Sequence, residues 1–207
     1  MERSCSPDGQ PATAAQRGGR YSPAERVALL ALARESIAQH LRTGKPLAVR
    51  LDDHPAPLRE PQACFVTLYA HGSLRGCIGC LQARRPLVEE VAQTACSAAF
   101  QDPRFPPLIE AELAQVEISL SVLSDTEPLR FGSERDLVAQ LRPHVDGLVL
   151  RDGLCSGTFL PIVWERYPEP AAFLRQLRMK AGLPADHWSD RLTVERYTTE
   201  SFSEAVP

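Results

Sequence analysis

Long apolar runs, a strong net charge and an export signal are all missing from this 207-residue sequence. The longest strictly apolar run, at residues 27–33, is far shorter than the ~20 residues of a membrane-spanning helix, so we expect no membrane segment. The first residues contain no apolar signal core, which favours a cytoplasmic protein over an exported one. A net charge of -3 lacks the basic excess typical of nucleic-acid binding, so we expect no nucleic-acid partner.

Paired metal-binding motifs are also missing, although the chain has six cysteines. Cys77 and Cys80 form a C-x-x-C pattern, but a structural zinc takes about four ligands, and no second Cys/His pair occurs at zinc-finger spacing. A thioredoxin-like dithiol needs a helix to begin at its first cysteine, whereas the next helix is expected near Pro86. We therefore predict no metal, no cofactor, and free thiols in a reducing compartment.

The composition is typical of a globular protein, with 43% hydrophobic residues and a mean hydropathy of -0.21. A chain of this length supports one core, or one core with a smaller satellite. Residues 1–20 are rich in Gly, Pro, Gln and Ala and show no periodicity, which predicts a disordered tail. We expect residues 21–207 to form a single domain.

Hydrophobic periodicity and turn residues divide the rest of the chain into helices and strands. Ser22 and Glu25 resemble a capping box, with Pro23 at the first helical position. The patterns predict helices at residues 22–42, 86–102, 133–142 and 170–181, a loop at 52–62, and strands at 64–70, 74–81, 116–122, 146–150, 155–160 and 192–202. Because helices and hairpins alternate without regular βαβ spacing, the predicted class is α+β: a mixed, largely antiparallel sheet with flanking helices.

The most informative segment is Leu74-Arg75-Gly76-Cys77-Ile78-Gly79, which we call the signature segment. In a strand, Arg75 and Cys77 would point to one face. A cation beside a thiol favours the reactive thiolate, and glycines allow a ligand to come close. The segment therefore predicts a site at which Arg75, Gly76 and Gly79 bind a ligand.

Two interpretations of Cys77 remain open: it is either a nucleophile or a small residue that packs between glycines. A nucleophile needs a base within reach, for which His71 and Glu117 are the candidates. In the first case Arg75 is a further catalytic candidate, because it would bind an anion or activate the thiol. In the second case Arg75 forms an internal salt bridge, for which Glu117 is the expected partner.

Asp102 and Arg104 follow the expected end of the helix that begins near Pro86. We expect residues 102–107 to be mainly structural, with Phe105 packed beneath them. Asp102 and Arg104 are also expected to rim the site as ligand-binding residues. Three large aromatic residues are expected in the core or at a lobe interface rather than around a ligand: Trp164, Phe173 and Trp188.

Short motifs along the whole chain occur in an order that resembles the AMMECR-one domain family, whose prokaryotic members are called AmmeMemoRadiSam system protein A. The resemblance begins with the signature segment and continues with Asp102-Pro103-Arg104-Phe105-Pro106-Pro107-Leu108, residues 117–124, Asp146-Gly147-Leu148, Gly157-Thr158-Phe159-Leu160-Pro161 and Lys180-Ala181-Gly182-Leu183-Pro184. It covers about residues 22–204. It implies a larger and a smaller lobe, with the signature segment near a cleft. It also implies an association with a Memo-type protein and a radical-SAM enzyme, but no particular reaction.

Two positions depart from the pattern of that family. Cys80 stands where such sequences usually have Thr or Ser, and the 154–156 segment, which contains Cys155, stands where they more often have Arg. If the family uses that arginine to bind an anion, this chain lacks the contact.

Two classes of function follow from the sequence. The first is an accessory or partner-binding module of a Memo-type/radical-SAM system, with a site around Arg75 and Cys77. The alternative is an enzyme that uses the Cys77 thiolate on a small molecule, a nucleobase or a protein group. A reactive thiol would favour the enzyme, and an inert thiol the module.

Overall fold

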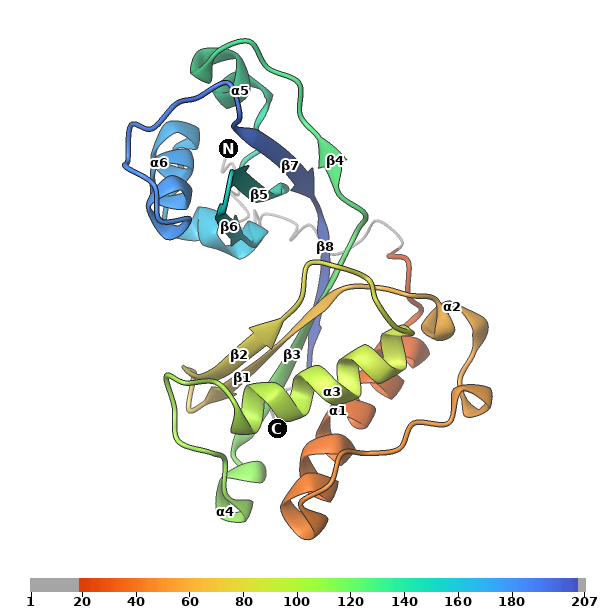
Figure 1. Ribbon diagram of the computed structural model, residues 1–207. Coiled ribbons are helices and arrows are strands. Elements are labelled where there is room, and N and C mark those ends of the chain that lie inside the picture. The colour runs from red at the N-terminus through yellow and green to blue at the C-terminus, as the bar shows by residue number, and fades with distance from the viewer. Residues whose placement is uncertain (1–18, 205–207) are drawn as a thin grey trace, which may run out of the picture.

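The computed structural model describes residues 19–204 and has two lobes, each built on a four-stranded sheet (Figure 1). The larger lobe contains α1 (Pro23–Thr43), the 3₁₀ helix η1 (Leu51–Asp53), α2 (Ala56–Arg59), β1 (Cys64–Ala70), β2 (Ser73–Gly79), α3 (Leu87–Phe100), α4 (Glu110–Leu113), β3 (Val116–Leu123) and β8 (Thr199–Ser203). The smaller lobe contains β4 (Glu127–Pro128), α5 (Glu134–Gln140), β5 (Gly147–Asp152), β6 (Cys155–Phe159), the 3₁₀ helix η2 (Pro161–Glu165), α6 (Pro170–Lys180) and β7 (Thr193–Tyr197). The predicted α+β class is confirmed.

The strands form two separate sheets, ordered β2-β1-β3-β8 and β4-β7-β5-β6. All neighbouring strands within these two sheets are antiparallel, which confirms the largely antiparallel pairing, whereas the prediction of a single mixed sheet is wrong. The larger and smaller lobes implied by the family resemblance correspond to these two sheets. Within residues 19–204, no helix is both long and apolar enough to cross a membrane.

Helix α1 begins and ends where its sequence signals predict. The backbone N–H of Ser22 donates to the Glu25 carboxylate at 2.8 Å, and Ser22 Oγ accepts from the backbone N–H of Glu25 at 3.3 Å. This capping box satisfies donors that the first turn of a helix leaves free. Gly44 ends the helix in the left-handed conformation, with φ of 69°.

The core of the larger lobe lies between its sheet and the helices α1 and α3, which cover the same face of the sheet (Figure 1). The alternation predicted for β3 is confirmed: Ile118 and Leu120 are fully buried, whereas Glu117 and Ser119, which alternate with them, are half-buried. Strand β1 alternates in the same way and pairs with β3 along its whole length. A side chain of β1 therefore faces either α3 or the opposite side of the sheet.

The smaller lobe has its own core around Trp164 and Phe173, whose rings stack with centroids 3.8 Å apart. Both side chains are fully buried, which confirms two of the predicted core aromatic residues. Trp188 is 37% exposed and packs against Phe131 and Arg178 at the surface of this lobe.

The strand predicted at residues 192–202 is in fact two strands that belong to different sheets. β7 pairs with β5 in the smaller lobe, and β8, which begins two residues further on, pairs with β3 in the larger lobe. Figure 1 shows this blue segment running from one lobe into the other. A third apolar cluster joins the lobes here: Ala63, Leu123, Val149 and Tyr197.

Two further sequence predictions need adjustment. The loop predicted at residues 52–62 contains the short helix α2, whose Leu58 is fully buried. Of the tail predicted at residues 1–20, residues 1–18 lie outside the described part of the chain. Arg20, at its end, donates through its guanidinium to Gln62 and through its backbone N–H to Glu200.

Candidate thiol site

A β-bulge at Arg75 sets the geometry of the signature segment. Leu68 of β1 lies opposite Gly76, whereas the next residue, Tyr69, lies opposite Leu74, so Arg75 is an extra residue on β2. The regular alternation that would place Arg75 and Cys77 on one face is interrupted at this point.

The Arg75 guanidinium is paired with the carboxylate of Glu112 on α4. Its Nε and Nη2 donate to the two carboxylate oxygens at 2.9 and 3.0 Å, and the side chain is only 10% exposed. The prediction of an internal salt bridge is therefore confirmed, but the partner expected from the sequence, Glu117, is wrong. Because the Glu112 carboxylate neutralises the Arg75 guanidinium, Arg75 is not the cation that would activate the Cys77 thiol.

Cys77 lies directly opposite Thr67 of β1 and is half-buried. Thr67 Oγ1 donates a hydrogen bond to Cys77 Sγ at 3.2 Å. The backbone N–H of Cys77 donates to Asp102 Oδ2 at 2.8 Å, and its carbonyl oxygen accepts from Arg104 Nη2 at 3.2 Å. These three contacts fix the thiol and the backbone on both sides of it.

Asp102 and Arg104 form the ion pair that anchors this segment. Arg104 Nη2 lies 2.6 Å from Asp102 Oδ2, and the Asp102 side chain is only 2% exposed while that of Arg104 is 53% exposed. Hydrogen bonds from Arg104, supported by the N–H of Cys77, hold the pKa of Asp102 far below its usual range. The structure thus brings Asp102, Arg104 and Cys77 together, as the sequence predicted. Whether they bind a ligand stays a prediction.

The two glycines of the signature segment are explained by close packing. A Cβ atom on Gly76 would lie 2.3 Å from the carbonyl oxygen of Ala98 in α3. A Cβ atom on Gly79 would lie 2.3 Å from Cγ of Phe65 on β1. Glycine lets helix α3 and the neighbouring aromatic ring come this near to the strand. A direct role for either glycine in ligand binding stays a prediction.

The two candidate bases have different surroundings. His71 lies at the exposed turn of the β1–β2 hairpin, where it hydrogen-bonds Gln115 at 3.2 Å, and the structure shows no contact between it and Cys77. Glu117 lies opposite Tyr69 on the sheet. The pKa of Tyr69 is raised by burial, and further by the charges of Cys77, Glu117 and Glu165. The charges of both Glu117 and Cys77 therefore affect the hydroxyl group of Tyr69.

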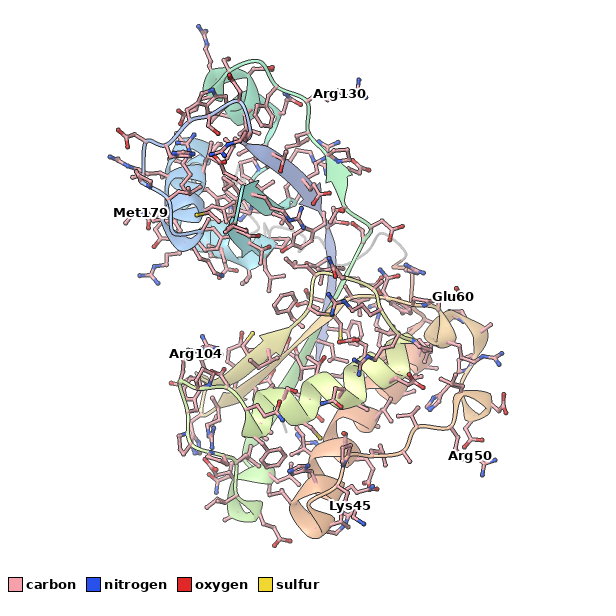
Figure 2. The ribbon with its side chains drawn as sticks, in the orientation of Figure 1. Lys45, Arg50, Glu60, Arg104, Arg130 and Met179 are labelled. Carbon is pink, nitrogen blue, oxygen red and sulfur yellow. The ribbon has the colours of Figure 1, made fainter. Side chains whose placement is uncertain are left out.

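Lys180 is the last residue of helix α6 in the smaller lobe, and the sequence analysis did not single it out as a site residue. Its Nζ lies 5.0 Å from the centroid of the Phe159 ring. Burial lowers the pKa of Lys180, the charge of Cys77 raises it and that of Arg104 lowers it. The Lys180 side chain covers the Phe159 ring, while the residue as a whole remains solvent-exposed. Arg104 and Met179, which precedes Lys180, are labelled on the same side of the molecule in Figure 2.

Cys80 faces away from this site. Its Sγ donates to the carboxylate of Glu90 on α3 at 3.2 Å, and burial together with that carboxylate raises the pKa of the Cys80 thiol. The cysteines within residues 19–204 are all free, as predicted, and Cys5 lies outside that range. The same part of the chain holds no cluster of His, Cys, Asp or Glu that could bind a metal ion.

Fold and site together define a two-lobed α+β protein with a half-buried thiol held on the larger lobe by Thr67, Asp102 and Arg104. The chain belongs to the AMMECR1 family, because the family model matches residues 30–202. The order of motifs that the sequence analysis identified therefore reflects membership of this family.

Proteins from archaea are similar to this chain over nearly its whole length. A protein of Methanothermobacter thermautotrophicus is 40% identical over 190 residues, which cover 89% of this chain and 98% of that protein. A protein of Thermococcus onnurineus is 39% identical over 188 residues, covering 86% of this chain and 90% of that protein. The crystal structure of protein PH0010 from Pyrococcus horikoshii matches with a TM-score of 0.81 at 35% identity, covering 87% of this chain and 91% of that one.

Proposed function

We propose that this protein is an enzyme whose nucleophile is the Cys77 thiol and whose small substrate binds between the two lobes. The observation that carries the proposal is the hydrogen bond of 3.2 Å from Thr67 Oγ1 to the Sγ of the half-buried Cys77. Nucleophilic cysteines typically lie in partly exposed, electropositive surroundings. Cys77 is partly exposed, and the guanidinium of Arg104 donates to its carbonyl oxygen at 3.2 Å.

Each neighbouring residue has a defined part in this proposal. The sulfur of Cys77 would form a bond to a carbonyl carbon of the substrate, the C=O π electrons would move onto the carbonyl oxygen, and the thiol proton would pass to water or to a nearby base. Thr67 orients the sulfur, and the Asp102–Arg104 pair fixes the backbone of Cys77. Glu117, which lies opposite Tyr69 on the same sheet, is retained as the candidate base in preference to His71, whose ring hydrogen-bonds Gln115 at the exposed turn.

The experiment is alkylation of the folded protein by iodoacetamide, followed peptide by peptide with mass spectrometry. We expect Cys77 to react faster than Cys155, which is also half-buried, and much faster than the fully buried Cys64. Replacing Thr67→Val should change the rate at Cys77 and leave the rate at Cys155 unaltered. If Cys77 reacts no faster than Cys64, or reacts only after unfolding, the thiol is a packing residue and the enzyme proposal is wrong.

A second candidate function is the accessory module of a Memo-type/radical-SAM system, working in the cytoplasm. Two exposed apolar side chains favour it: Leu74 is 41% exposed and Ile109 is 60% exposed. They lie next to the two ends of the Arg75–Glu112 pair, since Leu74 precedes Arg75 and the N–H of Ile109 donates to Glu112. Exposed apolar residues close together are typical of protein contact surfaces.

Purification of the tagged chain from its native cells, with mass spectrometry of what accompanies it, tests the second candidate. We expect a Memo-type protein or a radical-SAM enzyme to be retained by the parent chain and lost from the Leu74→Glu/Ile109→Glu variant. A Val27→Glu variant is the control, because Val27 is 66% exposed on α1, a different element. Equal retention by all three chains, or retention of neither protein, would contradict the accessory role.

A further inference from the structure

Two cysteines lie across from each other at the open end of the β1–β2 hairpin. Phe65 of β1 pairs with Gly79 of β2, so the next pair outward is Cys64 and Cys80. The backbone N–H of Cys80 donates to the carbonyl oxygen of Cys64 at 3.1 Å, which continues the antiparallel ladder to this pair. Directly opposed residues of such a ladder have Cα atoms about 4.5–5.5 Å apart, a separation that a disulfide spans. The backbone at this position therefore suits a cross-strand disulfide.

Both thiols lie on the face of the sheet that helix α3 covers. Directly opposed residues of two paired strands present their side chains on the same face. Cys64 is fully buried in the core between the sheet and the helices. Cys80 Sγ donates to Glu90 Oε1 at 3.2 Å, and Thr94 Oγ1 donates to the same oxygen at 3.2 Å. The pairing register and the shared cover by α3 therefore bring the two thiols together.

The C-x-x-C pattern of the sequence is not the pair that the fold brings together. Cys77 lies opposite Thr67, whose Oγ1 donates to the Cys77 sulfur at 3.2 Å. Cys77 and Cys80 are three positions apart, and side chains an odd number of positions apart along a strand face opposite sides of the sheet. A bond between Cys77 and Cys80 would require the end of β2 to separate from β1, whereas Cys64 is already on the same side as Cys80.

We propose that Cys64 and Cys80 form a reversible disulfide when the protein is exposed to hydrogen peroxide. The sulfur of Cys80 attacks one peroxide oxygen, the O–O bond breaks, and water leaves, which gives the sulfenic acid of Cys80. The sulfur of Cys64 then attacks the sulfur of that acid, the S–O bond breaks, and a second water leaves. In total the two thiols lose two electrons and two protons, and hydrogen peroxide is reduced to two molecules of water. An added dithiol reverses the bond by thiol–disulfide exchange.

Burial assigns the two cysteines different parts in this reaction. Cys80 is half-buried, so it is the thiol that peroxide reaches from solvent. Cys64 is fully buried, so it is shielded from peroxide and remains available to attack the oxidised Cys80. Thiols react with peroxide as thiolates, and the pKa of each of these thiols is raised by burial and by the charge of Glu90. The disulfide should therefore form slowly, during sustained rather than brief exposure.

Peroxide treatment of the folded full-length chain, followed by peptide mass spectrometry, tests the proposal. The remaining thiols are blocked with iodoacetamide in urea, and the chain is digested with trypsin in the absence of reductant. Because trypsin cleaves after Arg75, Cys64 and Cys80 leave on separate peptides. We expect these two peptides to be linked after peroxide treatment and to be released again by dithiothreitol.

Three variants identify which cysteines are linked. Cys77 shares the tryptic peptide of Cys80, so the mass of the linked peptides alone does not distinguish them. Cys80→Ser should abolish the link, and Cys77→Ser should keep it. Cys155→Ser is the matched control and should keep the link, since Cys155 is also half-buried but lies on β6 of the smaller lobe.

Circular dichroism of the treated chains shows whether the link forms in the folded protein. A reversible link between Cys64 and Cys80 in a folded chain supports the proposal. The proposal is wrong if the link forms only after unfolding, if either cysteine joins a different one, or if Cys80 stops at a sulfenic or sulfinic acid while Cys64 stays free. Loss of the link in Cys77→Ser but not in Cys80→Ser would assign the reaction to Cys77. An unmodified Cys80 in chains whose Cys155 is already oxidised would also overturn it.

Discussion

The backbone N–H of Cys77 donates to the carboxylate of Asp102 at 2.8 Å, which ties strand β2 to the loop that follows helix α3. Arg104 completes the link, because it pairs with Asp102 and also donates to the carbonyl oxygen of Cys77. Two motifs that lie far apart in the sequence, the signature segment and residues 102–108, are therefore one structural unit. The position of the Cys77 thiol is therefore set by two hydrogen bonds to the backbone of Cys77 as well as by the bond from Thr67 to its sulfur.

Replacing Asp102→Asn should destabilise the protein, because it removes a nearly buried carboxylate that accepts hydrogen bonds from both Arg104 and Cys77. We expect a loss of about 2 kcal/mol in the free energy of unfolding at pH 7, measured by urea unfolding. Half of the Arg104 side chain is solvated, which keeps the loss below that of a fully buried pair.

The pH dependence of that loss follows from the lowered pKa of Asp102. An aspartate in the unfolded chain has a pKa of about 3.9. The stabilisation by ionised Asp102 is complete above that pH and is lost as the pH falls through the lower folded-state pKa. The difference between the parent chain and Asp102→Asn should therefore be constant from about pH 5 to 7 and shrink below about pH 4. A difference that grows on acidification would show that the carboxylate is not stabilised by its charge.

Sequence reasoning succeeded where the signal is local. The capping box of Ser22 and Glu25 lies within one helical turn, so it predicts the start of α1 without reference to the rest of the fold. The alternation in β3 predicts burial of Ile118 and Leu120 for the same reason, since neighbouring residues of a strand face opposite sides.

The features that sequence reasoning missed depend on partners distant in the chain. The bulge at Arg75 depends on the register in which β1 pairs with β2. Glu112, the ion-pair partner of Arg75, lies on a helix that is too short to show hydrophobic periodicity. The division of residues 192–202 into β7 and β8 is likewise set by which sheet each half pairs with.

The pair of Arg75 and Glu112 should behave as one energetic unit. Arg75→Met and Glu112→Gln should each destabilise the protein, and the double variant should cost less than the sum of the two by about 1–2 kcal/mol. Removing Glu112 leaves the nearly buried Arg75 guanidinium without its partner, whereas removing Arg75 leaves a carboxylate that is 33% exposed. Because Glu112 takes up the charge of Arg75, the rate of alkylation at Cys77 should be unchanged in Arg75→Met. A large change in that rate would show that Arg75 acts on the thiol after all.

Gly76→Ala should be among the most damaging small substitutions in the chain. The new Cβ would lie 2.3 Å from the carbonyl oxygen of Ala98, so helix α3 would have to move away from β2. We expect a loss of about 3 kcal/mol in the free energy of unfolding, from the strain of overpacking. Gly132→Ala is the control: no atom lies within 4 Å of the new Cβ, and its effect should stay within about 0.5 kcal/mol. Equal effects at the two positions would refute the packing explanation.

The reactivity of Cys80 should be controlled by Glu90, independently of the Cys77 site. Cys80 Sγ donates to Glu90 Oε1 at 3.2 Å, and the Glu90 side chain is only 8% exposed. Burial is the larger cause of the raised pKa of Cys80, and the Glu90 charge adds to it. Glu90→Gln removes that negative charge, so the pKa of Cys80 should fall and more thiolate should be present at a given pH.

Alkylation of Cys80 at pH 7.5 should accordingly be about three to ten times faster in Glu90→Gln than in the parent chain, because a lower pKa leaves more thiolate. Glu89→Gln is the matched control, because Glu89 lies on the same helix and forms no ion pair within residues 19–204. Peptide mass spectrometry reports Cys77 in the same samples, and its rate should not change, since its side chain faces the opposite side of the sheet. An unchanged rate at Cys80 would mean that burial alone holds this thiol inert, whereas equal acceleration of both cysteines would point to a general loosening of the fold.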